Sequence, residues 1–123
     1  MTIQECYQQL GGDYSDMVRR LPNVNLIRKF LMRFPEDDSY SSLCRAMEGG
    51  DRADAFRAAH TLKGVCANLS LNRLLASVSR LTELLRPEGA GIPADAARLL
   101  DEVKCDYTWT INAIRAYTDS RSD

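Results

Sequence analysis

Apolar residues in this chain recur at spacings of three and four residues, the period of an amphipathic α-helix, over nearly its whole length. The alternation of apolar and polar residues that marks a half-buried strand is almost absent. With 123 residues, the chain has the length of one domain and can bury a core without disulfides or metals. The pattern predicts an all-α domain over residues 1–118 and a frayed tail over residues 119–123.

Proline, glycine and capping residues divide this helical pattern into segments. The spacing predicts short helices over residues 2–10 and 14–21, then a helical stretch that begins after Asn23, is interrupted at Pro35 and ends at Gly49. Proline lacks the amide hydrogen that a helix interior needs, and glycine readily ends a helix. The N-terminal part is therefore expected to contain several helical segments of different lengths.

The later boundaries follow from similar signals. Asp51 is the expected N-cap of one helix and Ser70 that of the next, because a short side chain with an oxygen can accept a hydrogen bond from first-turn amides. Residues 87–93 (PEGAGIP) are predicted to form a loop. The last helix carries an apolar bundle seam, and Trp109, off that seam, is expected to be partly buried between helices. These features predict an antiparallel four-helix bundle with an additional short N-terminal helix.

Composition excludes several classes of protein. The formal net charge is -1, without the basic excess of a general nucleic-acid binder, and no apolar run is long enough to span a membrane. The single histidine and the four widely spaced cysteines make no zinc-binding pattern, so no metal or cofactor is expected. The cysteines are expected to be free thiols of a cytoplasmic protein. Because one bundle uses all the apolar stripes, a monomer is expected.

The only histidine, His60, lies within the helix predicted after Asp51. At about 100° per residue, the core stripe of this helix is centred on Leu62, and His60 lies about 160° from that centre. His60 is therefore expected on the outer face and not among core side chains. An exposed histidine by itself most often has no function, so its neighbours must decide. The predicted stripe comprises Ala55, Ala58, Ala59, Leu62, Val65, Cys66 and Leu69.

The neighbours of His60 favour a functional role. Gly64 follows one turn later on the same face, although glycine inside a helix costs about 1 kcal/mol relative to alanine. No packing reason for glycine is expected at an exposed position, whereas close approach of another macromolecule to the imidazole would explain it. Lys63 and Arg57 can place positive charge beside an anionic group on the ring. The small side chain of Ala67 leaves the same face without a protruding group. An exposed imidazole is largely neutral and nucleophilic at neutral pH.

Residues 60–70, HTLKGVCANLS, resemble the signature of histidine-containing phosphotransfer (HPt) domains, the helical-bundle intermediates of multistep phosphorelays. The matching pattern is a histidine, two residues, Lys-Gly, and then Asn-Leu and a small residue at a set distance. By this resemblance, His60 would be the phosphoacceptor, Lys63 would lie near the phosphoryl group, and Gly64 would leave room for the partner's active-site loops. Ser70 departs from the family, where glycine is common; a small cap residue is expected to serve equally well.

The resemblance also implies partners. These are receiver domains of response regulators, which supply the phosphorylated aspartate and the Mg²⁺, and a hybrid histidine kinase. The predicted partner-binding residues are Phe56, Arg57, Ala67 and Asn68. For Phe56, half-burial against a neighbouring helix is an equally good explanation. The chain is expected to carry phosphate without being an enzyme, because it has no second histidine, nucleophile elbow or phosphate-binding glycine loop.

Two alternatives stay open. A helical docking module could bind a receiver or a kinase without carrying phosphate, although such a module need not keep His60, Lys63 and Gly64 together. A phosphorylatable domain of a larger chemotaxis-type kinase would share the spacing from histidine to glycine. The 123 residues hold no ATP-binding segment, and the initial methionine and short ends favour a free-standing chain.

Overall fold

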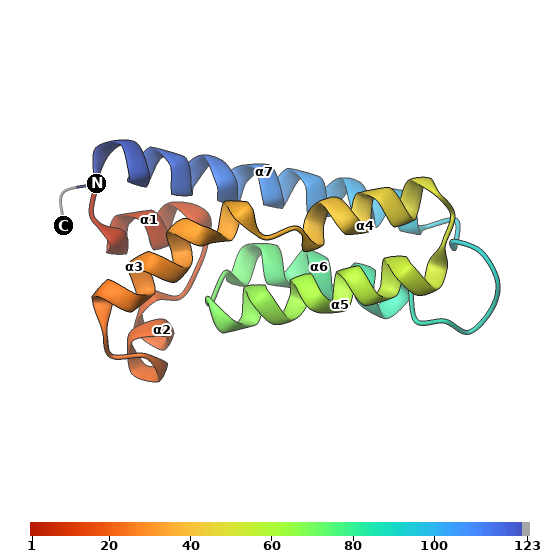
Figure 1. Cartoon of the computed structure of the whole chain (residues 1–123), viewed down its shortest axis with the longest axis horizontal. Helices are drawn as coiled ribbons and strands as arrows, with labels where there is room; N and C mark the ends of the chain where they lie inside the picture. Colours follow the sequence, from red (N-terminus) through yellow and green to blue (C-terminus); the bar gives the residue numbers. More distant parts are fainter. Residues whose placement is uncertain (122–123) are drawn as a thin grey trace.

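The computed structural model describes residues 1–121, and those residues form helices and turns without any strand. This confirms the predicted all-α helical bundle. The elements are α1 (Ile3–Leu10), α2 (Tyr14–Arg20), α3 (Val24–Arg33), the 3₁₀ turn η1 (Phe34–Glu36), α4 (Ser39–Glu48), α5 (Arg52–Asn68), α6 (Asn72–Leu84) and α7 (Ala96–Ser120) (Figure 1). Helix α7 extends into the predicted tail as far as Ser120, and residues 122–123 of that tail lie outside the described residues.

The long axis of the molecule is set by α4, α5, α6 and α7. Each of these helices packs against the next one along the chain, and Figure 1 shows the chain direction alternating between them. Helix α3 lies end to end with α4 along the long axis, and the 3₁₀ turn at Pro35 separates the two helices, as the sequence predicts. Tyr40 of α4 stacks on Tyr107 of α7 with ring centroids 3.7 Å apart, which links these two helices.

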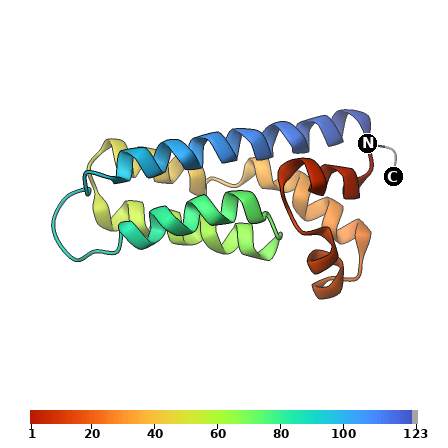
Figure 2. The same ribbon diagram turned by 180° about the vertical axis from the view of Figure 1, so that it is seen from behind.

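Two short helices, α1 and α2, precede this arrangement, where the prediction named one additional helix. Figure 2 shows α7 along the whole length of the molecule, with α1 beside its C-terminal half. Helix α1 begins with a capping box, in which Thr2 and Glu5 each bond to the other's backbone amide. Gly11 ends it with a φ of 75°, a left-handed conformation that suits glycine.

The core is built from the predicted stripes, mostly leucine and isoleucine, and their burial supplies the main driving force for folding. Among the described residues, no helix has the length and apolar content needed to cross a bilayer. The largest fully buried side chains are those of Tyr7, Leu10, Ile27, Leu31, Leu43, Leu62, Leu71, Leu74, Leu81, Leu85, Ile114 and Tyr117.

Trp109 corrects one expectation. Its side chain is exposed (50%), not partly buried between helices. The indole lies on the outer side of α7 beside the end of α1, where its N–H donates to the backbone carbonyl of Gln9. The guanidinium carbon of Arg73 lies 4.3 Å from the ring centroid. A polar contact and a cation therefore hold the indole at the surface, in place of a neighbouring helix.

Candidate functional site

The candidate site lies on α5, which forms as the sequence predicts. The Asp51 side chain accepts a hydrogen bond from the Asp54 amide at 2.9 Å and so caps the helix N-terminus. The predicted inner stripe is confirmed at its centre, because Leu62 and Cys66 are buried. Burial raises the pKa of the Cys66 thiol to about 12. The inward face thus fixes the rotation of α5 and turns the opposite face to solvent.

His60 is exposed on that outer face, as predicted. Its imidazole centroid lies 5.9 Å from the ring centroid of Phe56, and the two rings are tilted by 50°. Within residues 1–121, the His60 side chain forms no hydrogen bond and no ion pair. Phe56 is half-buried, so it both packs against the bundle and flanks the imidazole. An imidazole in this setting is accessible to a group that a partner brings.

Gly64 is exposed one turn after His60. A methyl group built at Gly64 would meet no atom of another helix within 4 Å, and the backbone there is ordinary right-handed helix. Neither packing nor backbone conformation therefore requires glycine at this position. Glycine makes the helix less stable than alanine would, and the only evident gain is clearance beside the imidazole.

The positive charges near His60 are not equivalent. Arg57 is exposed and forms an ion pair with Asp54, one turn toward the N-terminus. Lys63 is half-buried and forms no ion pair within the described residues, although its charge contributes to lowering the pKa of Glu83 on α6. Of the two cations that the sequence singled out, Lys63 is thus the one left available for an anion on His60.

Arg86, just beyond the end of α6, is a further cation that the sequence did not indicate. Its Nε donates to Glu83 at 2.8 Å, and this bond is the main cause of the lowered pKa of the Glu83 carboxyl. The Arg86 guanidinium carbon lies 5.8 Å from the ring centroid of Phe56. No local pattern could have placed Arg86 beside Phe56, because these two residues meet only through the packing of α6 on α5.

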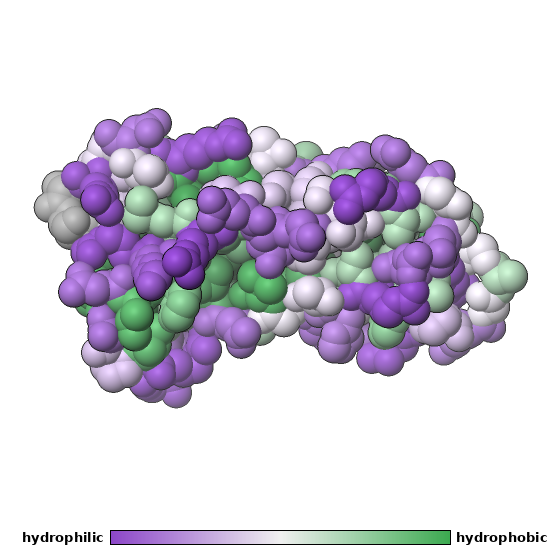
Figure 3. Space-filling model, in the orientation of Figure 1, coloured by the Kyte–Doolittle hydropathy of each residue, from purple (hydrophilic) through white to green (hydrophobic). Residues whose placement is uncertain are grey.

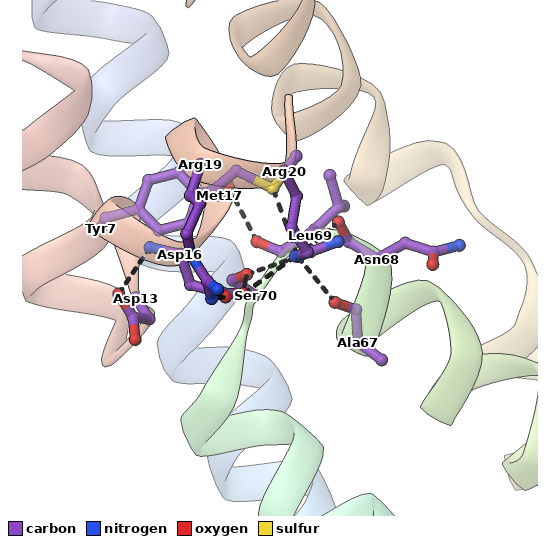
Figure 4. Close-up of polar contacts among 10 residues, drawn as sticks. All are labelled: Tyr7, Asp13, Asp16, Met17, Arg19, Arg20, Ala67, Asn68, Leu69 and Ser70. Carbon is purple, nitrogen blue, oxygen red and sulfur yellow. Dashed lines mark hydrogen bonds and ion pairs between the residues drawn. The ribbon is translucent and has the colours of Figure 1, made fainter. Parts of the chain in front are cut away.

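The C-terminal end of α5 is held by Arg20 of α2 (Figure 4). Arg20 donates from one terminal nitrogen to the backbone carbonyls of Ala67 at 3.1 Å and Asn68 at 3.2 Å, and to the Ser70 hydroxyl at 2.6 Å. A guanidinium at this position satisfies carbonyls that a helix end leaves unpaired. The side chains of Ala67 and Asn68 remain exposed, so these two of the four predicted partner-binding residues lie on an anchored helix end.

Ser70 corrects the predicted cap. Helix α6 begins at Asn72 with Leu71 in the cap position, and no side chain caps it. The Ser70 hydroxyl donates instead to Asp16 at 2.9 Å while it accepts from Arg20, so it serves α2 and not α6. Ser70 also has a φ of 53°, in the left-handed region that favours glycine. Glycine at this position would therefore relieve the backbone.

The turn after α1 packs against the same joint. The buried Tyr7 hydroxyl donates to the Leu69 carbonyl at 2.8 Å, and burial raises the pKa of Tyr7. The Asp13 amide donates to the Ser70 carbonyl at 3.0 Å. A methyl group on Gly12 would lie 2.7 Å from that Ser70 carbonyl oxygen, so close packing requires glycine there. The N-terminal helices thus support the end of the histidine-bearing helix.

An apolar groove of about 490 Å³ adjoins this end of α5. Figure 3 shows apolar surface gathered on this side of the molecule, over α2, α3 and the neighbouring end of α5. Phe30 of α3 is 43% exposed beside it. The groove is lined by Met17, Arg20, Leu21, Phe30, Arg33, Phe34, Asp37, Val65, Asn68 and Leu69.

The family model of the Hpt domain matches residues 25–116, which is most of the chain and includes all of α5 and α6. The chain therefore belongs to the Hpt domain family. Members of this family are phosphotransfer modules, not classical enzymes, and they act with receiver domains and histidine kinases in two-component phosphorelays. No curated protein and no solved structure matches the chain significantly.

Proposed function

We propose that this domain is a phosphorelay intermediate: His60 accepts a phosphoryl group from a receiver-domain aspartate, or from a kinase, and transfers it to another receiver. Lys63 and Gly64 would lie next to the phosphoryl group, and Phe56, Arg57, Ala67 and Asn68 would contact the partner. Gly64 carries the proposal, because an exposed glycine beside an exposed histidine has no structural reason on this helix. The domain, residues 1–118, would act as a cytoplasmic monomer without cofactor or ATP site.

The chemistry needs little from this chain beyond a nucleophile and access. A neutral ring nitrogen of His60 attacks the phosphorus of the aspartyl phosphate, the P–N bond forms, and the P–O bond to the carboxylate breaks. The aspartate leaves with that electron pair, so the positive charge on the phosphorylated ring balances the charge of the released carboxylate. Lys63 is placed to offset the negative charge of the phosphoryl oxygens. The reverse steps deliver the group to the next receiver.

The experiment that tests this proposal is intact-protein mass spectrometry at neutral pH after incubation with phosphorylated receiver domains from the same cell. The expected result is a gain of one phosphoryl group that is lost in acid and is absent in His60→Gln. Circular dichroism of His60→Gln would verify that the variant is folded. A folded wild-type protein that binds a receiver but gains no phosphoryl group would contradict the proposal and favour the docking-module alternative.

A further inference from the structure

Phe56 forms a bridge between His60 on α5 and Arg86 at the end of α6. The His60 imidazole lies 5.9 Å from the Phe56 ring and the Arg86 guanidinium carbon lies 5.8 Å from it, both measured to the ring centroid. The half-buried ring packs against the core, so its position relative to the bundle is fixed. A cation from the segment that follows α6 therefore contacts the same ring as the candidate phosphoacceptor.

The backbone of Arg86 is anchored to the start of α5. Arg52 donates to the carbonyl of Arg86 at 2.6 Å, and also to those of Leu85 and Leu84, each at 3.3 Å. These bonds satisfy the carbonyls that α6 leaves unpaired at its C-terminus. The base of the Arg86 side chain is therefore fixed relative to the helix that carries His60, although residue 86 begins the loop between α6 and α7.

The head of the Arg86 side chain is held much less firmly. It is 52% exposed, and Glu83, its partner, is 63% exposed. Ion pairs this exposed are weak because solvent screens them, so a stronger anion can displace the carboxylate. The Glu83 pair uses Nε, and the two terminal nitrogens form no hydrogen bond within the described residues. Those nitrogens are the donors that bind phosphate oxygens in a bidentate manner.

We propose that Arg86 is a second phosphate-binding cation, which rests on Glu83 and Phe56 in the unphosphorylated protein and moves to the phosphoryl group when His60 carries it. The change is an exchange of ion pairs, and no covalent bond forms or breaks. The inference rests on the proposed phosphorylation of His60 and names a residue outside the motif that suggested that function.

The test uses the full chain, labelled with ¹⁵N and phosphorylated by a receiver domain or by phosphoramidate. In the wild type, the Nε–Hε resonance of Arg86 is expected to shift on phosphorylation, while that of Arg80 stays in place. Arg80 is the matched control, because it is a nearby arginine on α6 that pairs with Glu102 of α7. An unmoved Arg86 resonance on a protein with phosphorylated His60 would overturn the inference, and this measurement needs no variant.

A second measurement is the ³¹P titration of the phosphoryl group. A nearby cation favours the dianion, so Arg86→Gln is expected to raise the titration midpoint by about 0.3 pH unit, whereas Arg80→Gln leaves it unchanged. Glu83→Gln releases Arg86 and is expected to lower the midpoint. Equal midpoints in wild type and Arg86→Gln would refute the role of Arg86. Failure of His60 to take any phosphoryl group would instead refute the proposed function, so the two failures are distinguishable.

Discussion

Gly64 lies one helical turn after His60 on the exposed face of α5, and a methyl group at Gly64 would point into open space. A histidine side chain thus lies beside a residue that has no side chain. Alanine at position 64 would make α5 a better helix, and nothing in the fold opposes that change. The proposed function gives the glycine a reason, which is clearance for a partner that approaches His60.

Gly64→Ala is expected to raise the free energy of unfolding by about 0.5–1 kcal/mol, because alanine has the higher helix propensity. Phosphoryl transfer from a receiver to His60 is expected to slow in the same variant, since the methyl group occupies the path of the partner's loops. Urea denaturation and a transfer time course measure the two effects. Ala76→Gly, on the exposed side of α6, is the matched control and should lower stability without changing transfer. Faster or equal transfer in Gly64→Ala would contradict the role of the glycine.

Lys63→Ala is expected to slow phosphorylation of His60 by about tenfold, because a phosphoryl group on His60 would lose the cation of α5 that is available to it. The free energy of unfolding should change by less than about 0.5 kcal/mol, because Lys63 has no ion-pair partner within the described residues to lose. Arg57→Ala is the comparison, since Arg57 already pairs with Asp54, and its effect on the rate should be smaller. A larger loss in Arg57→Ala than in Lys63→Ala would reverse the roles given to the two cations.

The elements that the sequence predicted are those that local chemistry decides. Pro35 cannot lie in a helix interior without loss of a hydrogen bond, Asp51 caps the helix that follows it, and residues 87–93 cannot continue a helix. The inner stripe of α5 follows from helical geometry, and the exposure of His60 follows from that stripe. Because the motif lies within one regular helix, its positions on the surface could be worked out before the structure.

The features that the sequence missed depend on contacts between segments far apart in the chain. Arg20 reaches the end of α5 across 47 and 48 residues, and nothing near Arg20 in the sequence marks that contact. Ser70 is of a residue type that commonly caps helices, yet its hydroxyl forms a long-range hydrogen bond with Asp16 instead. Arg86 approaches Phe56 only because α6 packs on α5. Such pairings are set by tertiary packing, on which local propensity has no bearing.

Ser70 offers a test of the strain at the joint between α5 and α6. Ser70→Ala loses the hydroxyl bonds with Asp16 and Arg20 and keeps a side chain at positive φ, so it should be destabilised. Ser70→Gly loses the same bonds but relieves the left-handed backbone, so it should be more stable than the alanine variant by about 1 kcal/mol. Chemical denaturation of the two variants measures the difference. Equal stabilities would show that the backbone at position 70 is not strained.

Stability should fall in acid partly through Asp16. The hydrogen bond from Ser70 and then the one from Arg20 hold the pKa of the Asp16 carboxyl below its ordinary value of 3.8. A carboxyl whose pKa is lower in the folded state binds fewer protons there than in the unfolded state. Its contribution to the free energy of unfolding is therefore complete above the pKa of the unfolded state. That contribution disappears as the pH falls through the pKa of the folded state.

This contribution can be isolated by denaturation of wild type and Asp16→Asn between about pH 6 and pH 2, the range in which ordinary and lowered carboxyl pKa values lie. The gap in stability between the two proteins is expected to be largest at pH 6 and to narrow below the ordinary pKa, as the wild-type carboxyl takes up its proton. Asp101→Asn is the control, because Asp101 is exposed on α7 and forms no ion pair within residues 1–121. The pH dependence of the gap for Asp16→Asn is judged against the gap measured for this variant. A gap for Asp16→Asn that varies no more with pH would show that Ser70 and Arg20 do not hold the carboxylate in solution, and the anchoring of α2 to the end of the histidine helix would then rest on the carbonyl bonds of Arg20 alone.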